Sequence, residues 1–390
     1  MKLAPLALPA LLALSFSAQA ADKIKIGFVS TLSGPLSGLG IEIRDGFRLA
    51  LKETDGKIGG LPVEVVEGDD QASPDVGKQI VDRMLKRDKV DFMTGVVYSN
   101  VMLAVGAPTF AAKTFYVSAA AGPASLAGAQ CNPYFFGLSW QNDGQAEAMG
   151  TYMTEKGFKN VFILAPNYAG GRENLAGFKR YFKGKIAQES YVKLGELDFA
   201  SELSQIRAAK PDAVFFFLPG SMGTNFLKQF NASGLGKDLP YFVPGYSADE
   251  DTIQAVGDPM VGLYNSSHWA WDLDNAANRK FVAAFRAQYK RTPSMYAFQG
   301  YDVARLIDRA VGDVKGNVED KKALHAALAA ARFDSARGSF KFNSNQFPIN
   351  SFYLRQIQKD ANGVVTNKTV SRIIDSHTDS YAGECKMKPL

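Results

Sequence analysis

Histidine and cysteine are scarce in this chain of 390 residues, which has three histidines and two cysteines. The histidines His268, His325 and His377 stand far apart, and neither a metal-spaced histidine pair nor a G-x-S-x-G motif is present. A structural zinc site needs four closely spaced ligands of these types. The sequence therefore predicts no metal, no cofactor and no catalytic set. Turnover of a bound compound would be the observation that favours an enzyme instead.

A hydrophobic run long enough to cross a bilayer is also missing. The apolar stretch after Lys2 contains Pro5 and Pro9 and closes on Ala18-Gln19-Ala20. A spanning helix needs about 20 apolar residues, whereas a charged start, a short apolar stretch and a small-x-small end are typical of a secretory signal peptide. We predict that residues 1–20 are cleaved and that the mature chain lies in the periplasm, without stable membrane insertion.

Charge of one sign does not dominate either. The 44 basic residues are scattered among 39 acidic ones, giving a net charge of +5. No basic stripe of the kind that binds nucleic acid is visible. After cleavage about 370 residues remain, enough for two domains that each have a core.

The two cysteines are Cys131 and Cys385. Neither is near the predicted cleavage site, so a lipid-anchored mature end is not expected. An exported protein folds in an oxidising compartment, where a disulfide between them is the expectation. Two separate free thiols are the alternative.

Short apolar strands alternate with helical patterns along most of the chain. The expected strands of a first series are 24–28, 63–66, 90–93 and 114–117, and those of a second are 161–164, 213–217, 241–243 and 262–264. Helices with 3.6-residue spacing lie between them, one of them opened by Ser73-Pro74. This alternation predicts an α/β protein with two doubly wound parallel sheets, followed by two helices near 275–289 and 294–311 and a terminal hairpin at 351–357 and 366–374.

Ligands bind open parallel sheets beyond the carboxyl ends of the strands. The glycine-rich loop 30–40 lacks the ending of a P-loop and does not fit G-x-G-x-x-G, which argues against nucleotides. After the third strand, Ser99 is predicted as a helix N-cap, where its hydroxyl and free N–H groups would hold a carboxylate. Tyr168 and Tyr246 are placed on loops that follow strands of the second series.

With these residues in view, the chain resembles the type I periplasmic binding proteins of the branched-chain amino acid (Leu/Ile/Val-binding) branch. The specific pieces are Ile26-Gly27 with Ser33-Gly34-Pro35, Gly95 with Ser99, and Asp69-Asp70. The resemblance implies two lobes joined by a three-crossover hinge near 140–142, 269–272 and 343–348. It places the first lobe at 21–140 plus about 272–345, the second at 141–271 plus about 346–375, and a tail at 376–390.

In that family the serine matching Ser99 and a loop matching 118–122 hold the ligand carboxylate, and a tyrosine matching Tyr168 covers the ligand. Gly122 stands here where a threonine is frequent, so one hydroxyl is missing. The residues expected to bind the ligand are Leu39, Tyr98, Ser99, Asn100, Ala120, Ala121, Gly122, Tyr168, Gly220 and Tyr246.

Leucine-type binders carry an acidic residue where Tyr246 stands, and it neutralises the α-amino group. A phenol cannot pair with a desolvated ammonium, and a buried unpaired charge costs several kcal/mol; a shift of three residues would bring Asp249 there instead. The segments 98–100, 121–128, 139–143 and 166–168 resemble a sub-branch for aromatic acids, which also shows the Cys131 and Cys385 pair. We therefore expect a monomeric receptor that delivers a small carboxylate, such as a benzoate or phenylpropanoid derivative, to ABC importer membrane subunits. The alternatives are an amino acid binding protein and a soluble ligand-sensing subunit.

Overall fold

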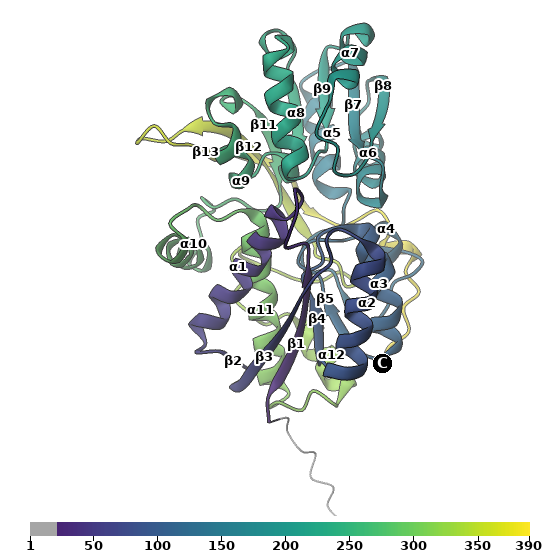
Figure 1. Cartoon of the computed structure of the whole chain (residues 1–390), viewed down its shortest axis with the longest axis vertical. Coiled ribbons are helices and arrows are strands. Elements are labelled where there is room, and N and C mark those ends of the chain that lie inside the picture. Colours follow the sequence, from purple (N-terminus) through teal and green to yellow (C-terminus); the bar gives the residue numbers. More distant parts are fainter. Residues whose placement is uncertain (1–21) are drawn as a thin grey trace, which may run out of the picture.

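A computed structural model of the chain describes residues 22–390. The described residues form two lobes stacked along the long axis of the molecule (Figure 1), each built around one sheet. The predicted signal peptide, residues 1–20, lies outside the described residues.

The first lobe contains a six-stranded sheet in the order β2-β3-β1-β4-β5-β6. All neighbours in it are parallel except β2, which pairs antiparallel with β3. Its strands are β1 Ile24–Ser30, β2 Lys57–Ile58, β3 Leu61–Asp69, β4 Phe92–Thr94, β5 Phe115–Val117 and β6 Phe135–Phe136. The helices of this lobe are α1 Gly38–Glu53, α2 Pro74–Arg83, α3 Ser99–Ala111, α4 Ala124–Ala127, α10 Ala276–Tyr289, α11 Met295–Asp313 and α12 Lys321–Ala330.

The second lobe contains a seven-stranded sheet in the order β13-β12-β11-β10-β9-β7-β8. It is parallel from β8 to β11, and β12 and β13 add an antiparallel hairpin at one edge. Its strands are β7 Asn160–Pro166, β8 Lys185–Val192, β9 Ala213–Phe216, β10 Tyr241–Pro244, β11 Tyr264–Ser267, β12 Asn350–Lys359 and β13 Val365–His377. Its helices are α5 Gly144–Glu155, α6 Ala169–Tyr181, α7 Ala200–Ala209, α8 Ser221–Ala232 and α9 Glu250–Val256.

These two parallel-dominated sheets confirm the predicted α/β class, and the terminal hairpin is confirmed as β12 and β13.

Local signals account for several helix starts. The Ser73 hydroxyl accepts from the Val76 N–H at the start of α2, and Asn275 and Ser294 cap α10 and α11 in the same way.

Three strands were not predicted from the sequence. β2 and β6 have only two residues each, too short for a periodic pattern. β8 is an edge strand whose residues are mostly half-buried or exposed, and polar residues interrupt its apolar ones. The strand signal is an apolar alternation, and it is weak where neither face is fully covered.

Between residue 22 and the end of β13, the chain passes between the two lobes three times. Crossover 1, residues 137–143, joins β6 to α5; crossover 2, residues 268–275, joins β11 to α10; crossover 3, residues 331–349, joins α12 to β12. The return at crossover 2 brings α10 and α11 against α1 in the first lobe.

Helices α1 and α11 touch through their backbones at two glycines. A Cβ on Gly46 would lie 1.8 Å from the Ala297 carbonyl oxygen, and a Cβ on Gly300 would lie 1.9 Å from the Ile43 carbonyl oxygen. Such distances are far inside van der Waals contact, so only glycine permits this approach.

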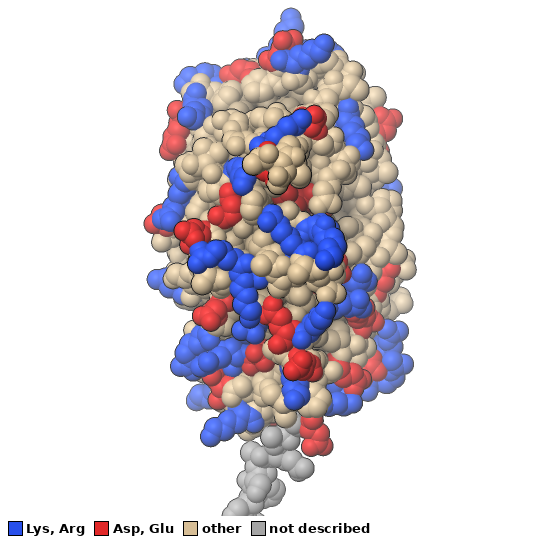
Figure 2. All heavy atoms as spheres, turned by 90° about the vertical axis from the view of Figure 1, so that its left-hand side faces the viewer, with Lys and Arg blue, Asp and Glu red and all other residues tan. Residues whose placement is uncertain are grey.

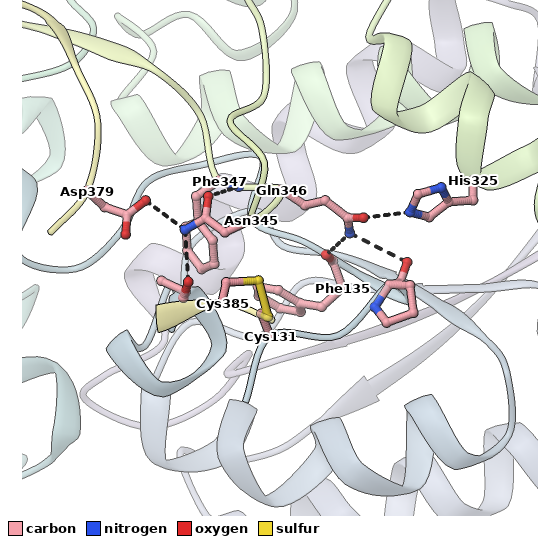
Figure 3. The surroundings of a disulfide bond; sticks show 10 residues. Cys131, Phe135, His325, Asn345, Gln346, Phe347, Asp379 and Cys385 are labelled. Atoms are coloured by element: carbon pink, nitrogen blue, oxygen red, sulfur yellow. Dashed lines mark hydrogen bonds between the residues drawn. A yellow bond between two sulfur atoms is a disulfide. The ribbon is translucent and has the colours of Figure 1, made fainter. Parts of the chain in front are cut away.

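The predicted disulfide between Cys131 and Cys385 is confirmed (Figure 3).

On the surface, basic and acidic side chains are interspersed over the face shown in Figure 2. From residue 22 to the end of the chain, no helix is both long enough and apolar enough to traverse a bilayer.

Candidate ligand-binding site

A cavity lies between the two lobes, beyond the carboxyl ends of their central strands. The first lobe, crossover 1 and the second lobe all contribute to its wall. It is lined by Leu39, Val97, Tyr98, Ser99, Ala120, Trp140, Asn142, Tyr168, Gly170, Asn174, Phe217, Pro219, Tyr246 and Tyr296. None of these residues is an aspartate, a glutamate, a lysine or an arginine, so the wall carries no full charge.

Aromatic rings make up most of the apolar wall, namely Tyr98, Trp140, Tyr168, Phe217, Tyr246 and Tyr296. The Trp140 and Tyr246 ring centroids are 5.0 Å apart, and those of Tyr98 and Tyr168 are 6.2 Å apart in an edge-on arrangement. Tyr98 and Tyr168 belong to different lobes, so the cavity is closed across the cleft. Rings in contact at these distances offer a flat apolar ligand both stacking and edge-on partners.

Hydrogen-bond donors gather at the start of α3. Ser99 was predicted as the N-cap; this was wrong by one residue, because Tyr98 has extended torsion angles (φ −96°, ψ 132°) and Ser99 is the first helical residue. The N–H groups of Ser99 and Asn100 precede the first intrahelical bonds, and no acceptor for them is found among residues 22–390. The Ala120 N–H is also without an acceptor within that range.

Asn142, in crossover 1, organises this donor group. Its Nδ2 donates to Ser99 Oγ at 2.9 Å and to Glu173 Oε2 at 2.6 Å. Because Ser99 Oγ already accepts a hydrogen bond, its own hydrogen is left to donate elsewhere. Free N–H groups at a helix start together with a free hydroxyl donor suit an anion, and a carboxylate in particular.

The neighbouring backbone amides are already used within the protein. Gly122 N donates to Asn142 Oδ1 at 3.1 Å, and Ala121 N donates to the Val96 carbonyl at 3.4 Å. Gly122 is also needed for packing, because a Cβ there would lie 1.9 Å from the Trp140 carbonyl oxygen. Both residues therefore support the loop, and Ala120 is the member of this loop that lines the cavity.

Glu173 lies behind Asn142 and outside the cavity wall. Burial, reinforced by the charge of Asp143, raises the pKa of Glu173 to about 8, although the Asn142 hydrogen bond opposes this shift. Glu173 is consequently neutral near pH 7. A neutral carboxyl at this position leaves the donor group free of a repelling negative charge.

On the second lobe, Tyr246 and Asp249 have different surroundings. Tyr246 lines the cavity, and its buried hydroxyl has no hydrogen-bond partner in the described part of the chain. Asp249 lies outside the wall and is occupied elsewhere. It forms a buried ion pair with Arg355 at 3.4 Å and accepts the Met295 N–H at 2.5 Å.

The structure brings six of the predicted ligand-binding residues together in the cavity wall: Leu39, Tyr98, Ser99, Ala120, Tyr168 and Tyr246. The other four, Asn100, Ala121, Gly122 and Gly220, lie outside the wall. Gly220 faces Leu39 from the opposite lobe, its Cβ position 3.7 Å from Leu39 Cγ.

Sequence reasoning missed several lining residues: Val97, Trp140, Asn142, Gly170, Asn174, Phe217, Pro219 and Tyr296. Trp140 and Asn142 were predicted as part of a hinge crossover and of a resembling segment, but not as ligand-binding residues. Tyr296 opens a helix that returns to the first lobe late in the chain, and no local signal connects it with α3 or α6.

A family model described as a periplasmic binding protein matches residues 23–362. The chain belongs to this family. It is 26% identical to Leu/Ile/Val-binding protein homolog 6 of Brucella abortus (strain 2308) over 373 residues, 93% of this chain and 94% of the relative.

Two solved structures of ABC transporter solute-binding proteins are also similar to this periplasmic binding protein. One, from R. palustris in complex with benzoate, is 31% identical with a TM-score of 0.88, covering 93% of this chain and 99% of the other. The second, from Rhodopseudomonas palustris BisB5 in complex with 3,4-dihydroxy benzoic acid, is 29% identical with a TM-score of 0.85, covering 92% and 99%.

These similarities confirm the type I periplasmic binding protein predicted from the sequence, in the branched-chain amino acid family. The protein is a solute-binding receptor of an ABC transporter and not an enzyme. Membership of the family implies a periplasmic location.

Proposed function

We propose that this receptor captures an aromatic monocarboxylate, of the benzoate or phenylpropanoid type, in the cavity between its lobes. The observation that carries the proposal is the composition of the wall, which joins six aromatic rings to a cluster of free hydrogen-bond donors and holds no acidic side chain. The ligand carboxylate would accept from the Ser99 hydroxyl and from the amides of Ser99 and Ala120. Its ring would lie between Tyr168, Tyr246 and Trp140.

The relatives that bind benzoate and 3,4-dihydroxy benzoic acid support this ligand class. An α-amino acid would bring an ammonium group into a wall that offers no carboxylate. Leaving a desolvated ammonium unpaired costs several kcal/mol. Asp249, which the alternative alignment would use, is already paired with Arg355.

The second candidate is a branched-chain amino acid, favoured by the Leu/Ile/Val-binding names of the relatives. Melting temperature separates the two classes. A ligand present at about 100 times its Kd adds about 2.7 kcal/mol of stability, or several degrees. We expect benzoate, hydroxybenzoates or cinnamate-type acids to raise the Tm, with no shift from leucine, isoleucine or valine. A shift with the amino acids alone refutes the aromatic ligand.

We further propose that the lobes close on the ligand as two bodies, 21–140 with about 272–345 and 141–271 with about 346–375. The carboxylate would dock first at the start of α3, and Tyr168 and Tyr246 would then cover the ring. Closure would let the membrane subunits distinguish the loaded receptor from the empty one. The receptor would act as a monomer, after removal of residues 1–20.

A further inference from the structure

The end of the chain crosses from the second lobe to the first beside crossover 1. Strand β13 ends at His377 in the second sheet, and eight residues later Cys385 is bonded to Cys131, which precedes β6 of the first sheet. We call residues 377–385 the C-terminal strap. It is a fourth covalent connection between the lobes, in addition to the three crossovers.

Two buried carboxylates of α5 and its N-cap hold the strap on the second lobe. Tyr381 Oη donates to Asp143 Oδ2 at 2.8 Å and accepts from Arg180 Nη2 at 3.0 Å. Ser380 Oγ donates to Glu147 Oε1 at 3.0 Å. The side chains of Asp143 and Glu147 are fully buried, so these contacts are shielded from water.

On the first lobe the strap is held by its disulfide and by Asp379. Asn345 Nδ2 donates to Asp379 Oδ2 and to the Ala127 carbonyl, both at 2.9 Å. Figure 3 shows this Asp379–Asn345 bond beside the Cys131–Cys385 bond. The strap therefore has anchors on both sides of the boundary between the lobes.

Crossover 1 leads from these anchors directly to the cavity. Asp143, which receives the Tyr381 hydroxyl, is also tied to Gln141 by two bonds of 3.0 Å. Between them stands Asn142, whose backbone N–H donates to the Gly122 carbonyl at 2.9 Å and whose Nδ2 donates to Ser99. A chain of contacts thus runs from the disulfide through Tyr381 and Asp143 to the Ser99 hydroxyl.

We propose that the C-terminal strap holds crossover 1 in place. Tyr381 is then a positioning residue that acts through Asn142 on the binding of the ligand by the Ser99 hydroxyl. The effect on the ligand rests on the proposed aromatic carboxylate, whereas the effect on the crossover does not. A strap that only stabilised the fold would raise the Tm without changing the mobility of residues 137–143 relative to the second lobe.

Tyr381→Phe tests the proposal, and Tyr191→Phe is its matched control. The Tyr191 hydroxyl also donates to a carboxylate, Glu189, at 2.7 Å, but it lies on the edge strand β8. Hydrogen exchange of a peptide covering 137–143 in the ligand-free protein should become about tenfold faster with Tyr381→Phe, as expected for losing a hydrogen bond to a charged group. Tyr191→Phe should leave this exchange unchanged. Unchanged exchange with Tyr381→Phe overturns the proposal that the strap holds crossover 1 in place.

The rate of benzoate dissociation tests whether the effect reaches the ligand. It should rise about tenfold with Tyr381→Phe in the wild-type background and not rise further in an Asn142→Ala background, because contacts in one network are not additive. A double substitution, Cys131→Ser with Cys385→Ser, should accelerate both exchange and dissociation. Faster exchange with unchanged dissociation overturns the positioning role of Tyr381. Faster exchange in a receptor that binds no aromatic acid supports the strap and refutes the proposed function instead.

Discussion

The two lobes contribute different chemistry to the same cavity. The first lobe supplies backbone N–H groups and the Ser99 hydroxyl, all fixed by the start of α3 and by Asn142. The second lobe supplies the large surfaces of Tyr168, Phe217 and Tyr246, with a phenol that has no partner among the described residues. Under the proposed function, the first lobe would recognise the charge of the ligand, and the second would enclose its apolar body together with Tyr98 and Tyr296 of the first lobe.

This division has a physical basis. Donors fixed by the backbone need no rearrangement when an anion arrives, so little entropy is lost on docking. Apolar surface gains free energy only when water is removed from both sides, which requires the second lobe to close. Each lobe is therefore suited to one stage of capture.

The largest expected effect comes from removing the surface that the second lobe contributes. Tyr168→Ala should weaken aromatic acid binding by about 2–3 kcal/mol, or roughly 30- to 150-fold, because it removes the Tyr168 ring and leaves the ring of the bound ligand more exposed to water. Calorimetric titration with benzoate measures the loss. Tyr168→Phe keeps the ring and should bind within about threefold of wild type. A loss with Tyr168→Phe as large as that with Tyr168→Ala would show that the hydroxyl, not the ring, binds the ligand.

Removing the donor on the first lobe should have a slightly smaller effect. Ser99→Ala should weaken carboxylate binding by about 1.5–3 kcal/mol, the range for a hydrogen bond to a charged group. Ser125→Ala is the matched control, since its buried hydroxyl has no hydrogen-bond partner among residues 22–390 and does not line the cavity. Equal affinities for Ser99→Ala and the control would contradict the assignment of charge recognition to the first lobe.

The smallest effect concerns pH and Glu173, a residue of the second lobe that reaches the donors of the first through Asn142. Its pKa of about 8 means that it gains a negative charge as the pH rises from 7 to 9. Carboxylate binding that requires the neutral form should weaken about tenfold over this interval. Because the folded protein binds this proton more tightly than the unfolded chain, folding stability also falls as the pH rises through that pKa.

Glu173→Gln should abolish most of this alkaline loss while retaining affinity at pH 7. Titrations of both proteins at pH 7, 8 and 9 provide the comparison. An equally steep pH dependence in Glu173→Gln would assign the effect to another group.

The fold could be predicted from the sequence where apolar periodicity and helix caps agree. Strands such as β1 and β9 are buried along nearly their whole length, and Ser73-Pro74 marks the start of α2 as expected. Strand β8 escaped prediction because polar residues interrupt its apolar ones and most of its residues are only partly covered. Two-residue strands have no period to detect.

The site could be predicted less completely, for a different reason. Loops after strands pointed to Ser99, Tyr168 and Tyr246, all of which line the cavity. Asn142 and Tyr296 were not among the predicted site residues, because a polar residue in a crossover and a tyrosine in a helix carry no local signal of function. Their roles depend on which segments the three crossovers bring together.

The close contact of α1 with α11 has a consequence for how this cavity can change during evolution. The two helices carry Leu39 and Tyr296 to the wall, and Gly46 and Gly300 lock their backbones together. Neither helix can slide or tilt without colliding with the other's carbonyl groups. On this side of the cavity, selection for a wider or narrower solute would therefore act by exchanging the side chains at Leu39 and Tyr296, on a frame whose spacing the glycines keep constant.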